Sequence, residues 1–247
     1  IKLKNMDGSE TVFTLAKRYT FIPGDYMFTL EIAVEGKDGM KGLAFGEEAY
    51  TLRTSPQIGP EWDAAKDRYE YRYFSYFVDG KKNEERGITA GKTKVITRLA
   101  SWASVSGKYF ALIVIPKDPI QKMTFSGFKE QKAPLYNSQI FLSRPPITGN
   151  SSLDQYRIYI GPSSEKVLNI YNSAVSNNYG YDNLRIDAVA ASGGFLQPLE
   201  WLLKKAMELL YKLIPNWGVS IILVTILIKL IFFPLTKKSS EATQQMQ

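Results

Sequence analysis

A single lysine within a mostly apolar run is the residue that most needs a chemical explanation. Lys229 lies within the run from Val219 to Leu235, and Thr225 precedes it by about one helical turn on the same face. A cation at this place could attract acidic or polar groups if it faced a water-filled cavity or groove. Alternatively, its four-carbon side chain could carry the ammonium toward the headgroups at the end of the run. Depth alone does not separate these two interpretations.

Composition excludes most enzyme chemistry. The sequence contains neither His nor Cys, which rules out a Ser/His triad, thiol chemistry and metals held by imidazole or thiolate. The acid pairs at 47–48 and 84–85 sit in polar stretches and are typical of solvated loops. A Gly-Lys-Thr sequence at 91–93 lacks the earlier glycine of a phosphate-binding loop, because Arg86 stands there. The sequence therefore predicts no enzyme, no metal site and no cofactor.

The apolar run itself predicts a transmembrane helix over residues 216–236. Its seventeen residues would span roughly 25 Å, the short end of what a bilayer core requires. Lys237 and Lys238 follow directly, whereas Trp217 at the other end is an interfacial aromatic, so we expect the C-terminal side to be cytosolic. Residues 237–247 would begin a cytosolic segment and residues 1–215 would lie across the membrane. Without a starting Met or a signal-like segment, we expect a fragment or a processed product.

The charge balance favours contact with anionic surfaces. The formal net charge is +7, which suits membrane headgroups or acidic partners. The lysines and arginines are spread along the chain, and no basic block indicates binding to nucleic acid.

The first two thirds of the chain predict β structure. Period-two alternation rich in aromatic and β-branched residues runs from about residue 11 to 170. Strands are expected over 26–35, 68–78, 93–99, 109–115, 122–128, 138–142 and 156–160. Tyrosines at 69, 71 and 73 are interpreted as one buried sheet face or as a stacking surface for a sugar. The sequence predicts a large antiparallel β-sandwich domain over residues 1–194, with a short helix after Gly161-Pro162.

An amphipathic helix is predicted over residues 195–215. Apolar positions recur at spacings of three and four, the charges gather on the other side, Pro198 suits the first turn and Pro215 ends the helix. Trp201 and Tyr211, with Trp217 beyond the turn, could anchor it at a membrane interface. It could lie flat in the headgroup layer, or it could pack on the β domain.

Several motifs resemble the YidC-type membrane protein insertases. The sequence Asn-Trp-Gly-Val-Ser-Ile-Ile at 216–222, continuing to Lys229 and to Phe-Pro-Leu-Thr-Lys at 233–237, is similar to the first conserved-core membrane helix of that family. Gln-Pro-Leu at 197–199 resembles the start of its membrane-surface helix. The residues from 159 to 168 resemble the end of the periplasmic domain of bacterial members, and Trp102 with 108–110 is a further likeness. The resemblance covers about residue 102 to the end.

This resemblance implies a mainly β protein of the bacterial inner membrane. It implies a periplasmic β-supersandwich with a mutarotase-like fold, then an amphipathic surface helix and one transmembrane helix. The implied function is the insertion of nascent membrane proteins through a hydrophilic groove to which Lys229 and Thr225 belong. Implied partners are these clients, Sec translocon components, membrane lipids, and a ribosome through cytosolic regions outside this sequence. Most relatives carry Arg at the position of Lys229, and Lys keeps the charge without the bidentate fork.

Two other functions stay open from the residues. A membrane-anchored periplasmic module could recognise a sugar or a partner protein through its β-sandwich, and such an anchor would tolerate Leu in place of Lys229. An aldose-epimerase-like enzyme would rest on fold analogy alone, and the lack of His disfavours it.

Overall fold

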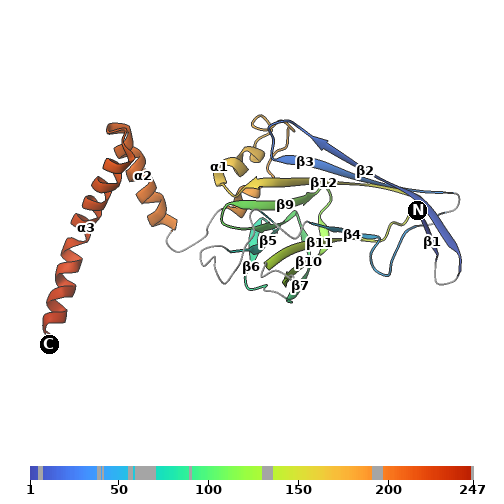
Figure 1. Ribbon diagram of the computed structural model, residues 1–247, viewed down its shortest axis with the longest axis horizontal. Coiled ribbons are helices and arrows are strands. Elements are labelled where there is room, and N and C mark those ends of the chain that lie inside the picture. Colours follow the sequence, from blue (N-terminus) through green and yellow to red (C-terminus); the bar gives the residue numbers. More distant parts are fainter. Residues whose placement is uncertain are drawn as a thin grey trace. The chain divides into compact units, whose positions relative to one another are not determined.

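The computed structural model describes most of the chain, in two compact units. It describes all residues except 5–7, 38–39, 41, 55–57, 59–70, 89–90, 130–135, 191–196 and 246–247. Within helices and strands, the side chains at 128–129, 136–137, 197, 200 and 234–245 also lie outside the description. Contacts between residues divide the chain into Ile1–Ala191 and Ser192–Gln247. The first unit is built from β-sheets and the second from two helices (Figure 1).

Eight strands form the larger sheet of the first unit, in the order β1-β2-β3-β12-β9-β8-β5-β6. Their bounds are Lys2–Lys4 (β1), Glu10–Phe21 (β2), Met27–Gly36 (β3), Tyr73–Val78 (β5), Lys81–Glu85 (β6), Trp102–Ser106 (β8), Phe110–Pro116 (β9) and Ser151–Pro162 (β12). Every pairing is antiparallel. The strand that comes last in the sequence, β12, lies in the middle, where Tyr156 faces Leu30 on one side and Pro116 on the other.

A smaller sheet of four strands packs against one face of the larger sheet. Its order is β4-β11-β10-β7, with bounds Tyr50–Arg53 (β4), Thr93–Ala100 (β7), Ile120–Lys129 (β10) and Tyr136–Arg144 (β11). Side chains from both sheets form the largest core cluster, in which the rings of Phe74 and Phe125 stack with centroids 4.8 Å apart. The predicted antiparallel β-sandwich is confirmed, and hydrophobic burial between two sheets is what holds it together.

Short helical turns cover the opposite face of the larger sheet. They are α1 (Glu165–Leu168), η1 (Asn169–Asn172) and η2 (Ile186–Val189). A second cluster is buried there, in which Trp102 and Tyr159 of the sheet pack with Tyr171 of η1. The Tyr171 hydroxyl donates a hydrogen bond to the Asp25 carboxylate. The central strands are thus buried on both faces, which explains the continuous apolar sequence of β9.

Most predicted strands are confirmed, and one differs in an informative way. The strand predicted over 68–78 begins at Tyr73, and residues 68–70 lie outside the described part of the chain. All residues from Phe74 to Val78 are buried, so the predicted alternation is wrong there because this strand lies between two packed layers. Tyr71 is exposed, so it does not belong to a buried face, and its ring stacks on Tyr73 at 5.5 Å.

The second unit contains α2 (Gln197–Leu213) and α3 (Trp217–Gln245), which contact each other. A helix, α2, lies within the range 195–215 where the amphipathic helix is predicted, and its place at a membrane surface stays a prediction. In the part of the chain that the structure describes, no helix combines the length and apolar character that a membrane crossing requires. The side chains at 234–236 lie outside the described ones, and the span predicted over 216–236 stays a prediction, as does the cytosolic segment after it.

Candidate functional site

The turn between α2 and α3 brings two aromatic rings together. Tyr211, in the last turn of α2, stacks on Trp217, the first residue of α3, with ring centroids 4.2 Å apart and planes 16° from parallel. Between them, the side-chain oxygen of Asn216 accepts hydrogen bonds from the backbone N–H groups of Gly218 (2.9 Å) and Val219 (3.3 Å). This is an ordinary helix N-cap, and it satisfies donors that the first turn of a helix leaves unpaired.

One face of α3 is buried. Ser220 is 0% exposed and Val224, one turn later, is also buried, whereas most other apolar residues of α3 are exposed. The Ser220 hydroxyl donates to the backbone oxygen of Asn216 at 3.0 Å. A small residue here lets α2 and α3 approach closely, as small residues do at many helix contacts.

Lys229 and Thr225 lie on the other side of α3. Lys229 follows Ser220 by nine residues, which is about two and a half turns, so the two side chains point in opposite directions. Lys229 and Thr225 are both exposed, and Ile222, Ile226 and Leu230 beside them are exposed as well. The predicted pair therefore shares one accessible stripe, whose setting is apolar apart from these two residues.

The hydroxyl of Thr225 can accept a further hydrogen bond but has no proton left to donate. It donates to the backbone oxygen of Ile221 at 2.8 Å, which occupies its proton. Its remaining capacity is that of an acceptor, whereas the ammonium of Lys229 is a donor with a full positive charge. The stripe can thus bind an acidic group at Lys229 and an N–H or O–H group at Thr225.

The predicted interface residues do not form a single cluster. Pro198 and Trp201 are exposed near the start of α2, and Trp217 is half exposed in its stack with Tyr211. Trp201 precedes Tyr211 by ten residues, or about 15 Å along the helix. The structure therefore brings Tyr211 and Trp217 together and leaves Trp201 by itself.

The apolar arc of α2 is divided between two environments. Met207, Leu210 and Tyr211 are half-buried, on the side where α2 contacts α3. A neighbouring stripe is exposed and consists of Leu199, Leu202, Leu209 and Leu213, the last being 72% exposed. Lysines at 204, 205 and 212 lie on the remaining side and are exposed. An exposed leucine stripe beside lysines is a pattern typical of helices that lie on anionic surfaces.

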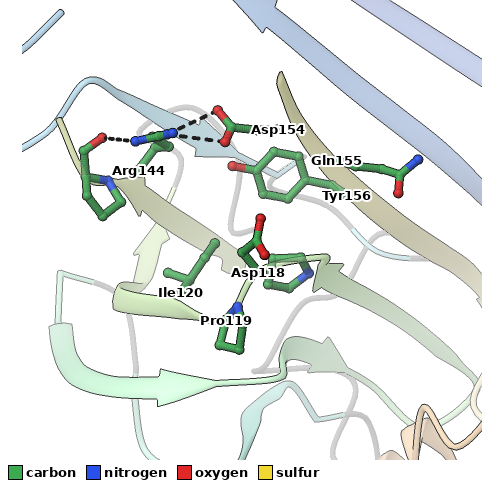
Figure 2. A pocket seen from close by; sticks show the side chains of 9 residues that line it. Asp118, Pro119, Ile120, Arg144, Asp154, Gln155 and Tyr156 are labelled. Atoms are coloured by element: carbon green, nitrogen blue, oxygen red, sulfur yellow. Dashed lines mark hydrogen bonds and ion pairs between the residues drawn. The ribbon is translucent and has the colours of Figure 1, made fainter. Parts of the chain in front are cut away.

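A pocket in the β domain was not predicted from the sequence. It has a volume of about 210 Å³ and lies between β12, the end of β11 and the loop that joins β9 to β10 (Figure 2). Three prolines line it with Ile120 and Tyr156, and Asp118, Arg144 and Asp154 bring charge. The volume is below the range of about 300–1,000 Å³ that is usual for small-molecule sites.

Two charged side chains of this pocket, Arg144 and Asp154, form an ion pair with each other. Arg144 donates through Nε to both carboxylate oxygens of Asp154, at 3.1 and 3.3 Å, and Figure 2 shows the guanidinium directed at that carboxylate. Asp154 also accepts hydrogen bonds from the hydroxyls of Tyr50 (2.7 Å) and Ser152 (3.1 Å). Burial, with hydrogen bonds to Tyr156 and Asp154, raises the pKa of Tyr50 far above its usual value. The network joins the two sheets and leaves little binding capacity for a ligand.

One sequence signal could have revealed this network. Asp154 is in phase with Tyr156 and Ile158, whose side chains reach the main core, whereas Leu153 on the other face of β12 is 68% exposed. A charged residue at a core-facing strand position is rare unless it is paired.

Three of the four acids singled out in the sequence, Glu48, Glu84 and Glu85, form ion pairs. Glu84 lies 2.8 Å from both Lys82 and Arg86, and Glu85 lies 2.6 Å from Lys94. Glu48 accepts a hydrogen bond of 2.7 Å from Lys122, and this bond lowers the pKa of Glu48. These contacts stabilise loops and sheet edges.

The Gly-Lys-Thr sequence at 91–93 begins in a turn. Gly91 has φ of +79°, a conformation that glycine adopts without strain, and its N–H donates to the backbone oxygen of Gly127 at 2.8 Å. These residues therefore form a turn that leads into β7. In the described residues, no group of three or more acidic side chains is arranged to hold a metal ion.

Comparison with known proteins gives one consistent result. Residues 2–185 match the family model described as the YidC periplasmic domain, and residues 209–247 match the model described as the 60Kd inner membrane protein. A protein of Treponema denticola named membrane protein insertase YidC is 70% identical over all 247 residues, which cover 42% of that relative. A protein of the same name from Treponema pallidum is 43% identical, with 100% of this chain and 44% of the relative covered. The chain thus spans less than half the length of these relatives.

Proposed function

The chain belongs to the YidC family of inner membrane proteins with a periplasmic domain, and on this premise we propose that it serves the insertion of nascent membrane proteins into the bacterial inner membrane. The observation that carries the proposal for these residues is the exposed stripe of Lys229 and Thr225, on the side of α3 opposite its contact with α2. Contact with α2 therefore leaves this stripe open to a client.

The mechanism rests on charge in apolar surroundings. A polar or acidic flank of a client loses its hydration when it moves into an apolar environment, at a cost of several kcal/mol for an unpaired charge. The ammonium of Lys229 offsets part of this cost by attraction, and the Thr225 hydroxyl accepts a hydrogen bond from the client. The client's hydrophobic segment then leaves sideways into lipid, where it is more stable. No covalent bond changes in this sequence.

Membrane lipid is the partner proposed for α2. The stripe of Leu199, Leu202, Leu209 and Leu213 supplies apolar area, and the lysines at 204, 205 and 212 complement anionic headgroups. This arrangement supports the surface-lying interpretation of the helix. The Sec translocon and the ribosome are proposed as partners on the family resemblance alone.

Site-specific photocrosslinking tests the client contact. A photoreactive amino acid is placed at Thr225 or at Leu227 in the full-length protein, and a ribosome-stalled single-spanning client is presented in membrane vesicles. Leu227 is the matched control, because it is exposed but faces about 200° away on the same helix. We expect crosslinks from 225 several times stronger than from 227. Equal yields from both positions, or none, would contradict the proposal.

The periplasmic binding module remains a second candidate because the β domain contains a pocket. The pocket is small and its charged residues are paired, which favours a structural role for it. The two candidate functions differ in whether the sequence of α3 matters. If α3 is only an anchor, an unrelated apolar helix of equal length will replace it without loss of insertion.

A further inference from the structure

The contact between Tyr211 and Trp217 restricts the angle between α2 and α3, because it joins the two helices across a short turn. α2 ends at Leu213 and α3 begins at Trp217, so three residues connect them. Pro215 lies in this turn, where it restricts the backbone and cannot continue a helix. Near-parallel rings at 4.2 Å then add a contact that exists at one relative orientation of the helices.

Hydrogen bonds hold the Trp217 side of this contact. Asn216 caps α3 through its side chain, and its backbone oxygen accepts from both the N–H and the hydroxyl of Ser220, each at 3.0 Å. The first turn of α3 is therefore firmly set. On the other side, the N–H of Ile214 bonds to the backbone oxygen of Leu210 at 2.9 Å and extends the helical pattern of α2 up to the turn. The ring contact therefore joins the end of α2 to the start of α3, and hydrogen bonds already hold each of these helix ends.

The angle decides which surface of α2 is left exposed. Half of its apolar arc, with Met207 and Leu210, is half-buried on the side of Tyr211, which contacts Trp217 of α3, and the leucine stripe with Leu202 and Leu209 stays accessible. Rotation of α2 by one residue, about 100°, would replace part of this stripe by lysines. Loss of the ring contact would allow such rotations and would disturb the position of α3 relative to the bilayer surface.

We propose that Tyr211 and Trp217 are positioning residues, whose ring stack holds α2 at a fixed orientation to α3 and so presents the leucine stripe to lipid and the Lys229 stripe to the client. The effect on insertion rests on the proposed function. The effect on helix geometry does not. The phenol oxygen of Tyr211 is not required, because the contact is made by the rings.

Spin-label distance measurements in the full-length protein test the stack. Labels are attached to cysteines at Lys204 on α2 and Ile231 on α3, both exposed, and these 247 residues contain no native Cys. Tyr211→Phe is the matched control, since it keeps the ring. Tyr211→Ala, Trp217→Ala and the double variant remove the stack. Insertion of a single-spanning client and thermal unfolding are measured for each protein in liposomes.

We expect Tyr211→Phe to match the wild type in distance distribution and insertion. Either alanine variant should give a broadened distribution and a roughly two- to ten-fold loss of insertion, the factor that a ring contact contributes to an equilibrium. The double variant should be no worse than either single one, because each removes the same contact. The midpoint of thermal unfolding of the β domain should not change.

Two results would overturn the proposal. One is an unbroadened distance distribution in both alanine variants, and the other is a Tyr211→Phe protein as defective as Tyr211→Ala. A wild-type protein that inserts no client would refute the proposed function instead, and the distance distributions would still decide whether the stack positions the helices.

Discussion

Ser220 and Lys229 occupy opposite faces of α3, the first fully buried and the second exposed. The helix thus has one face that contacts its neighbour and another that is exposed. Substitutions on the two faces should therefore have different effects, one on helix packing and the other on insertion.

Replacing Lys229 tests the charged face. Lys229→Leu should reduce insertion of a client with acidic flanks about ten-fold, because a charge attraction in apolar surroundings is lost. Lys229→Arg should retain insertion, since it keeps the charge and can bind a carboxylate through two nitrogens at once. Insertion into liposomes by the full-length protein gives the measurement. Full insertion by the leucine variant would show that the charge has no part in the reaction.

Enlarging Ser220 tests the packed face. Ser220→Leu should destabilise the contact between α2 and α3 by about 1–3 kcal/mol, because a well-packed position has no room for three more carbons. Ser220→Ala is the control and should change stability by no more than about 1 kcal/mol, for one lost hydrogen bond. Thermal unfolding in detergent, followed by helical circular dichroism, measures both. The prediction fails if the leucine protein melts like the wild type.

Removing the charge of Asp154 tests the network between the sheets. Asp154→Asn should lower the free energy of unfolding by about 2–4 kcal/mol, since Arg144 then keeps its charge in a mostly buried place without a carboxylate. The control is Asp118→Asn at the exposed rim of the same pocket, where we expect less than about 0.5 kcal/mol. Urea unfolding followed by tryptophan fluorescence compares them. Equal effects would mean that the network does not stabilise the fold.

The low pKa of Glu48 predicts a loss of stability in acid. The hydrogen bond from Lys122 lowers this pKa in the folded protein from the ordinary value of 4.5. The associated stability is complete above the unfolded value and disappears as the pH falls through the folded one, so the change begins just below about pH 5. Glu48→Gln should weaken the decline of the urea midpoint between about pH 5 and 3. An undiminished decline in Glu48→Gln would contradict this prediction.

A methyl group at Gly161 should disturb the packing of β12. A Cβ atom there would lie 2.8 Å from Cγ of Tyr26 and 2.9 Å from the Tyr159 hydroxyl oxygen, closer than such atoms approach. Gly161→Ala should therefore cost about 1–3 kcal/mol of unfolding free energy. At Gly149 the nearest atom is 3.9 Å away, and Gly149→Ala should be nearly neutral. If both variants unfold at the same urea concentration, Tyr26 moves aside more easily than this contact suggests.

Features of the structure that depend on a local sequence pattern can be predicted from the sequence. Alternation predicts most strands, and a charge in an apolar run identifies Lys229. The same alternation fails for β5, where every residue from Phe74 to Val78 is buried between two packed layers.

Contacts that depend on tertiary packing are harder to predict, even between residues close in the sequence. Arg144 and Asp154 meet because strands of two different sheets come together, and their spacing in the sequence carries no information about this. The sequence predicts Tyr211 and Trp217 each as an interface anchor, but their stacking depends on the path of the turn between them. Both contacts are missed for the same physical reason, because the packing of the folded chain determines which side chain each residue contacts.

The central place of β12 has a consequence for the order of folding. This strand joins β1-β2-β3 to β9-β8-β5-β6, and no other pairing in the described residues connects these two halves of the larger sheet. Its partners lie up to about 130 residues earlier, so closing the sheet requires long loops to be ordered first. The two halves cannot become one cooperative structure until residue 162 is available. The domain must therefore complete its folding late, after nearly all of its chain has reached the compartment where it folds.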